Sequence, residues 1–225
     1  MKQEPISESM AVGLLLALAG GILDAYSYLN RGEVFATAET GNIVQLSIHL
    51  SRGEWGDAFH YLLPISAFTL GVITAEAIRR RVEGRAGRLR WQQPILLAEC
   101  AALVVVAFLP SGPLDTLANI LIAFTSAVQM DSFRKFHGCA GSTTMCTGNL
   151  RSGTESLYRF LALPDPQAGV KASVYYRLIL SFALGAVLCG RLSQLFGIRT
   201  VLLACAPLLT AFFLMLRPAE ASSEA

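Results

Sequence analysis

The chain has 225 residues, of which 53% are hydrophobic and only 15% are charged, and its mean hydropathy is +0.51. Ordinary soluble domains carry about 25% charged residues, so this composition excludes a typical water-soluble domain and favours a lipid environment. The formal net charge is +2, and no stripe of aromatic and basic residues accompanies the arginines, so we expect no nucleic-acid partner.

Six stretches are apolar and nearly long enough to cross the hydrocarbon core of a bilayer, which takes about 20 helical residues. They lie at about 10–29, 58–80, 94–110, 114–133, 172–195 and 198–216. The first follows a leader in which Glu4 and Glu8 outweigh Lys2, unlike the positive start of a secretory signal peptide. We therefore expect a retained span, and one transmembrane domain over residues 1–225 with membrane lipids around it.

Basic residues between the spans predict the orientation of the chain. The link from Arg79 to Gln93 holds six arginines, and the link between the fourth and fifth spans holds five basic residues. The link at 30–57 has only Arg31 and Arg52. Because basic loops stay on the cytoplasmic side, the pattern predicts a multi-pass protein with both termini in the cytoplasm.

The tripeptide Thr-Gly-Asn occurs twice, at Thr40–Asn42 and Thr147–Asn149, and each copy follows an aspartate, Asp24 or Asp131, by sixteen positions. Both the aspartates and the tripeptides are 107 positions apart. Later in each half, "FTLG" at 68–71 resembles "FALG" at 182–185. These matches predict an internal repeat, with one copy at 10–110 and the other at 114–216. Each copy holds three spans, so the second enters the membrane from the opposite side, as in inverted-topology transporters.

The segment "TGNIVQLSIHL" at 40–50 is too short to span, since eleven helical residues rise only about 16 Å. We expect it to be a re-entrant half-helix capped by Thr40, with its counterpart beginning at Thr147. Half-helices entering from opposite faces would bring their N-termini to a central cavity. The candidate substrate-binding residues are Asp24, Thr40, Gly41, Asn42, Gln45, Gln129, Asp131, Thr147, Gly148 and Asn149. The alternative is a surface loop whose Thr-Gly-Asn caps an interfacial helix.

Asp24 lies about 21 Å along an ideal helix that starts at Met10. A carboxylate at such depth is costly and is by default a functional candidate: it could bind a cation, carry a coupling proton or neutralise the end of a half-helix. Asp131 lies beside Arg134 and Lys135, so an interfacial ion pair is the alternative there. For Gln129 the alternative is a hydrogen bond to a neighbouring helix.

The sequence contains no motif typical of catalysis, metal binding or nucleotide binding. The five cysteines and three histidines show no metal-ligand spacing, and no nucleophile–base pattern or nucleotide fingerprint is present. We therefore expect no metal, no cofactor, no catalytic residue and no enzyme.

The stretches "GGILDAYSYL…VFATAETGNIVQL" and "SAVQMDSFRK…STTMCTGNL" resemble the YoaK-like bacterial membrane proteins, a domain of unknown function, and the likeness runs from about Ala11 to Leu216. The resemblance implies an integral protein of the bacterial inner (cytoplasmic) membrane, with transport as the implied activity and no implied substrate. This chain departs from the family pattern at Glu39 and Cys146, the residues before each Thr-Gly-Asn, so we assign neither a role.

These features favour a secondary transporter or permease for a small solute. One form of this hypothesis couples transport to protons through Asp24 and Asp131. A passive channel with paired half-helices is the alternative, and a membrane assembly protein without a pore is a third. Free half-helix N-termini would favour an anion, whereas N-termini satisfied by the aspartates would favour a cation or a neutral solute. The oligomeric state stays open, a homo-oligomer included.

Overall fold

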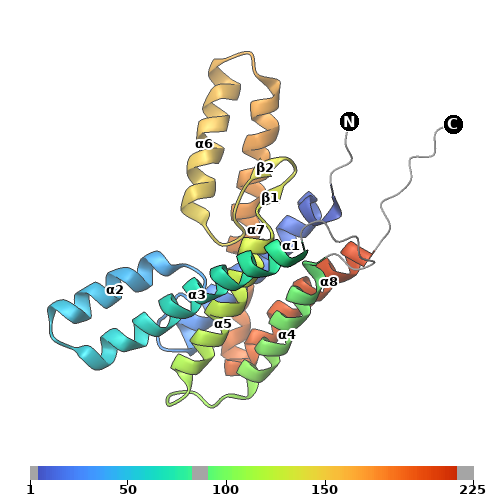
Figure 1. The fold of residues 1–225 in the computed structure, drawn as a ribbon. Helices are drawn as coiled ribbons and strands as arrows, with labels where there is room; N and C mark the ends of the chain where they lie inside the picture. Colours follow the sequence, from blue (N-terminus) through green and yellow to red (C-terminus); the bar gives the residue numbers. More distant parts are fainter. Residues whose placement is uncertain (1–4, 83–90, 217–225) are drawn as a thin grey trace.

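The computed structural model describes residues 5–82 and 91–216, and within them the protein is almost entirely helical (Figure 1). Two short 3-10 helices, η1 (Ile6–Glu8) and η2 (Gly197–Ala204), accompany the α-helices, and the strands β1 (Lys135–Phe136) and β2 (Cys139–Ala140) form a small antiparallel hairpin. The α-helices are α1 (Met10–Asn30), α2 (Glu39–Ser51), α3 (Trp55–Val82), α4 (Gln93–Phe108), α5 (Asp115–Ser132), α6 (Cys146–Ala162), α7 (Pro166–Phe196) and α8 (Cys205–Leu216).

Every predicted span falls on helical structure. Among the described residues, three helical stretches are long and apolar enough to cross a membrane: Met10–Asn30, Trp55–Val82 and the 51 residues Pro166–Leu216, whereas α4 is a shorter apolar helix. The last stretch combines α7, η2 and α8, and Gly197, with a φ of 52°, ends α7. The all-α prediction is therefore confirmed, and the count of six spans stays a prediction. Lys2, Glu4, Arg85, Arg88 and Arg90, which entered the predictions of leader and orientation, lie outside the described residues.

Two helix pairs hold the centre together: α1 packs against α7, and α3 packs against α5. Gly21 and Gly185 permit the first contact, because a Cβ at Gly21 would overlap the Phe182 carbonyl oxygen and one at Gly185 would overlap the Leu18 carbonyl oxygen. In the second pair, a Cβ at Gly71 would lie 2.5 Å from the Phe124 carbonyl oxygen. Small residues allow helix backbones to approach this closely.

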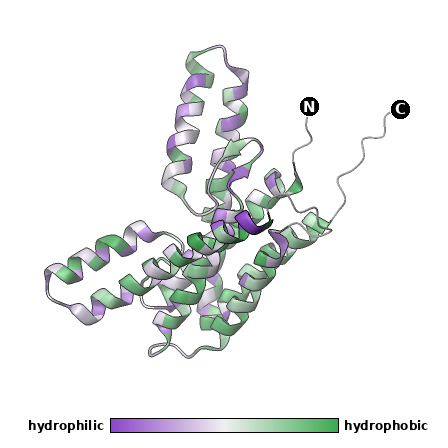
Figure 2. Cartoon of the chain, in the orientation of Figure 1, coloured by the Kyte–Doolittle hydropathy of each residue, from purple (hydrophilic) through white to green (hydrophobic). Residues whose placement is uncertain are grey.

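Two hairpins leave this centre in different directions (Figure 1). In one, α2 lies beside α3, and in the other, α6 lies beside α7. Figure 2 shows that α4 and α8 are largely hydrophobic whereas α6 carries many hydrophilic residues. The exposed pair of Glu155 and Arg159 on α6 is joined at 2.9 Å, as its spacing of four residues predicts.

Candidate functional site

A cavity of about 520 Å³ lies where the two Thr-Gly-Asn segments meet. It brings together residues from both halves of the chain: Asp24, Phe35, Thr37, Ala38, Glu39, Thr40, Gly41, Ile43, Phe68, Met130, Thr144, Met145, Cys146, Thr147, Gly148 and Phe182. Five of the predicted site residues, Asp24, Thr40, Gly41, Thr147 and Gly148, therefore lie around one space although up to 124 positions separate them.

The first Thr-Gly-Asn segment is held by the side chain of Asn42, which is 1% exposed. Its Nδ2 donates to the Phe35 carbonyl oxygen (2.7 Å) and to Glu39 Oε2 (2.9 Å), and its Oδ1 accepts from the Phe35 amide (3.1 Å). The predicted cap is wrong, because α2 begins at Glu39 and its N-cap residue, Ala38, provides no side-chain bond. Thr40 instead faces the cavity from the first turn of α2.

The second segment repeats this arrangement. Asn149, 5% exposed, donates from Nδ2 to the Ser142 carbonyl oxygen (2.6 Å) and accepts at Oδ1 from the Ser142 amide (3.4 Å). Phe35 and Ser142 are 107 positions apart, as are Asn42 and Asn149. Each asparagine thus closes the same seven-residue loop onto its own helix, and neither lies among the residues that line the cavity.

The charged side chains that line the cavity, Asp24 and Glu39, are both acidic. Asp24 is 5% exposed, and its Oδ1 accepts a hydrogen bond from the Thr37 amide (2.8 Å), directly before the N-cap of α2. Within the described part of the chain, Glu39 Oε1 is buried and has no hydrogen-bond partner. Both carboxyls therefore lie beside the positive end of α2, and none of the described lining residues is a lysine, arginine or histidine.

Asp131 lies outside the cavity, in an ion-pair network at the ends of α3 and α5. It pairs with Arg79 (3.2 Å) and with Arg134, and Glu76 pairs with the same two arginines at 3.1 and 2.6 Å. These ion pairs join α3 to α5, and an ion pair was the alternative that Arg134 and Lys135 suggested for Asp131.

The two predicted glutamines also lie outside the cavity lining. Gln45 is exposed on α2, and Gln129 is 3% exposed within α5.

Sequence reasoning missed Glu39 and Cys146, which were set aside because they depart from the family pattern, and both line the cavity. It also missed Phe68 and Phe182, although a signal was present. These two phenylalanines are the first residues of the matched tetrapeptides "FTLG" and "FALG". The repeat that predicted the polar residues of the cavity lining therefore also contained two of its aromatic residues.

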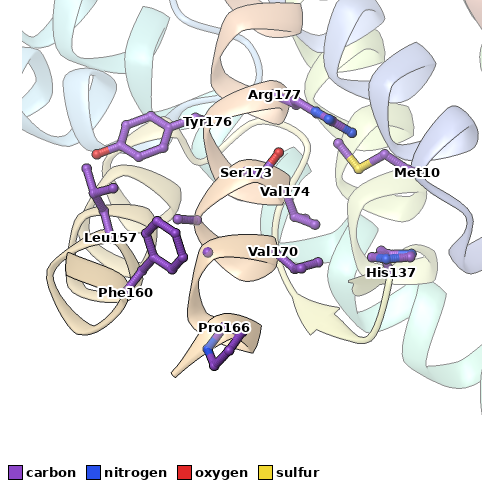
Figure 3. Close-up of a pocket in the computed structure, with 12 residues that line it drawn as sticks. Met10, His137, Leu157, Phe160, Pro166, Val170, Ser173, Val174, Tyr176 and Arg177 are labelled. Carbon is purple, nitrogen blue, oxygen red and sulfur yellow. The ribbon is translucent and has the colours of Figure 1, made fainter. Parts of the chain in front are cut away.

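A second hollow, of about 670 Å³, surrounds α7 near its start (Figure 3). Leu157, Phe160 and Tyr176 lie on one side of α7, and Met10, His137 and Arg177 lie on the other. No acidic side chain and none of the predicted site residues line this hollow.

In the part of the chain that the structure describes, one group of side chains could hold a metal ion. His49, Glu54 and Asp57, at the turn between α2 and α3, have ligand atoms within 4.8 Å of one another. His49 Nδ1 already bonds to Glu54 Oε2 at 2.7 Å, and Glu54 and Asp57 are partly or fully exposed. No predicted site residue belongs to this group.

Apolar helices packed through glycines around an acidic cavity define a helical membrane protein. The chain belongs to the DUF1275 family, described as a protein of unknown function, whose profile matches residues 12–214. It is 33% identical over 150 residues to the UPF0700 transmembrane protein YoaK of Bacillus subtilis (strain 168); the match covers 64% of each chain, so this chain spans less than two thirds of that relative. No solved structure matches the chain. The predicted YoaK-like membership is thereby confirmed.

Proposed function

We propose that this membrane protein is a secondary transporter or permease for a small solute, with its binding site in the cavity between the two Thr-Gly-Asn segments. One observation carries the proposal: Thr40, Gly41, Thr147 and Gly148 line one space together with the buried acid Asp24. Its volume of about 520 Å³ falls in the range typical of small-molecule sites, about 300–1,000 Å³.

The lining favours a cation or a protonated amine over an anion. Asp24 and Glu39 place two carboxyls in a cavity whose lining has no basic side chain, and Glu39 Oε1 lacks a partner among the described residues. The acids also neutralise the N-terminus of α2, which would otherwise attract an anion. Phe35, Phe68 and Phe182 add aromatic surface that suits an organic cation.

The inverted repeat is the second part of the proposal. The Asn42 and Asn149 clamps correspond at the same 107-residue offset, and the helix pairs correspond as well: α1 with α7, and α5 with α3. Two units of opposite orientation that share one cavity could open it alternately to either side. In this scheme α2 and α6 are the half-helices, and the solute site lies between their N-termini.

We further propose that the protein lies in the bacterial inner membrane with both termini in the cytoplasm. Arg79, Arg80 and Arg81 end α3, and Arg134 and Lys135 follow α5, so the cationic ends of both helices would lie on the cytoplasmic side. The α2–α3 turn would then face outward and the α6–α7 turn inward.

Uptake into proteoliposomes tests the proposal. With an inward proton gradient, we expect concentrative uptake of at least one member of a panel of K⁺, Na⁺, methylammonium and spermidine, and none of chloride or acetate. Asp24→Asn should abolish this uptake, whereas Asp57→Asn, which changes an exposed acid outside the cavity, should preserve it. Uptake of anions alone, or cation uptake indifferent to Asp24→Asn, would contradict the proposed site.

A passive channel is the second candidate, because two helix N-termini meet at one cavity, as paired half-helices do in a pore. The same liposomes distinguish the two functions. A channel would carry solute only down its own gradient, without dependence on the proton gradient, and Asp24→Asn would leave that flux in place.

A further inference from the structure

A second carboxyl lies in an apolar cavity of about 410 Å³ between α3, α4 and α5. Its walls include Ile78, Ile95 and Val128 with the aromatic rings of Trp91 and Phe124. Among the described residues that line it, Glu99 of α4 is the only one that carries a charge. This cavity shares no lining residue with the one between the Thr-Gly-Asn segments, so an inference from it does not depend on the proposed transport.

The Glu99 carboxyl is buried and only partly satisfied. Glu99 is 1% exposed, its Oε1 accepts a hydrogen bond from Ser126 Oγ at 3.3 Å, and in the described part of the chain its Oε2 has no hydrogen-bond partner. A buried carboxyl with one free oxygen is unfavourable unless a proton or a cation reaches it.

No cation of the protein itself occupies this position in the described structure. Arg79 lies over the Trp91 ring, 6.0 Å from its centre, but its guanidinium bonds to Glu76 and Asp131. The remaining titratable neighbours of Glu99 are the thiols of Cys100 and Cys205, and Cys205 Sγ lies 3.9 Å from the Cys100 carbonyl oxygen.

We propose that this cavity binds a lipophilic cation, with its positive charge beside Glu99 and its apolar body against the α3–α5 wall. The argument is charge complementarity in an apolar space: the described lining residues include one acid and no base, and Trp91 and Phe124 add aromatic surface that suits an organic cation. The volume of about 410 Å³ suits an organic ion rather than a bare metal ion.

Two ions of the same shape and opposite charge test the inference on the full chain in lipid nanodiscs, with empty nanodiscs as the baseline. Tetraphenylphosphonium should bind to the protein, and tetraphenylborate should not. Glu99→Gln keeps an acceptor for Ser126 and should weaken tetraphenylphosphonium binding at least tenfold, with an unchanged melting temperature. Ala98→Trp should block binding by filling the cavity, because Ala98 lines it.

Asp24→Asn is the matched control, and it should leave tetraphenylphosphonium binding unchanged while it abolishes the uptake proposed above. The two proposals can therefore fail separately. If a well-folded Glu99→Gln protein binds tetraphenylphosphonium as tightly as the parent, or if the parent binds both ions equally, the cavity does not select a cation and the inference is overturned.

Discussion

Asn42 and Asn149 are the residues whose observed contacts differ most from their predicted role. Both were candidate ligands, yet both are buried and use their amides to close a loop back onto its helix. The neighbouring Thr-Gly pairs face the cavity as a result. Within each tripeptide, the asparagine therefore fixes the loop backbone, whereas the threonine and the glycine line the cavity.

Asn149→Ala should destabilise the protein by about 1–3 kcal/mol, since it removes two hydrogen bonds and leaves Ser142 backbone groups without their partner. Asn42→Ala should cost at least as much, because it removes three. Thermal unfolding in detergent measures both changes. Gln45→Ala, an exposed position on the same helix as Asn42, is the control and should melt with the parent. Equal melting temperatures for all four proteins would rule out the clamp.

Arg31 is a second residue whose position decides its role. Its side chain is fully buried, and it donates to Tyr26 Oη (2.8 Å), to Asp115 Oδ1 (3.0 Å) and to the carbonyl oxygens of Val106 and Leu109 (both 2.9 Å). These partners tie the end of α1 to the C-terminus of α4 and the start of α5. A buried cation is stable here because nearly every donor of its guanidinium is satisfied.

Replacement of Arg31 by leucine should destabilise the protein by about 3–5 kcal/mol, because Asp115 loses its ion pair and the α4 carbonyl groups lose their donors. Size-exclusion chromatography after heating measures the fraction of protein that stays folded. Arg52→Leu removes the same charge at an exposed position on the same predicted side and should have little effect. If both variants were equally stable, the Arg31 contacts would contribute nothing.

At the scale of elements, the contact between α1 and α7 depends on Gly21 and Gly185, each of which faces the backbone of the partner helix. A Cβ at Gly185 would overlap the Leu18 carbonyl oxygen, whereas a Cβ at Gly190, five residues later on α7, would meet nothing within 4 Å. The two positions differ in their surroundings and share their helix. Alanine substitutions at the two positions therefore distinguish the effect of helix propensity from the effect of helix packing.

Gly185→Ala should lower the melting temperature, because the added methyl forces α1 and α7 apart and overpacking costs about 1–3 kcal/mol. Gly190→Ala should leave stability unchanged or raise it by about 0.5–1 kcal/mol, since alanine is the better helix former. Differential scanning calorimetry of the two purified variants measures both changes in melting temperature. A Gly185→Ala protein as stable as Gly190→Ala would mean that the close approach is not required.

At the scale of the whole molecule, local patterns in the sequence predicted the helices and the meeting of the two Thr-Gly-Asn segments. Apolar run length is a local property, and the repeat linked Thr40 to Thr147 without any knowledge of distance. Long-range partners could not be predicted in this way. Apart from Tyr26, the partners of the Arg31 side chain lie 75 or more positions away, and Asp131 pairs with Arg79 from 52 positions earlier. Only packing of the helices brings such groups together.

The family pattern assigned no role to Glu39, because this residue departs from the pattern, and the structure shows that it lines the cavity. Its position at the first residue of α2, beside Asn42 and facing the cavity, gives this acid a clear place in the site. Physical context, an acid at a helix N-terminus, was the better guide.

The last prediction concerns the orientation of the two hairpins. If the halves are inverted repeats, the tip of α2–α3 lies outside the cell and the tip of α6–α7 lies in the cytoplasm. Ser51→Cys and Ala162→Cys place a thiol at each tip, both at exposed positions. The background should carry alanine at Cys146 and Cys205, since Cys100, Cys139 and Cys189 are buried.

A membrane-impermeant maleimide should label Ser51→Cys in intact cells and should label Ala162→Cys only in inverted vesicles. The physical reason is the cost of moving the basic residues at the end of α3 and after α5 across the membrane, which would keep those ends inside. The protein with Cys146 and Cys205 replaced and no added thiol supplies the blank. Labelling of both tips from the same side would place the two hairpins on one face and remove the basis for alternate opening of the cavity.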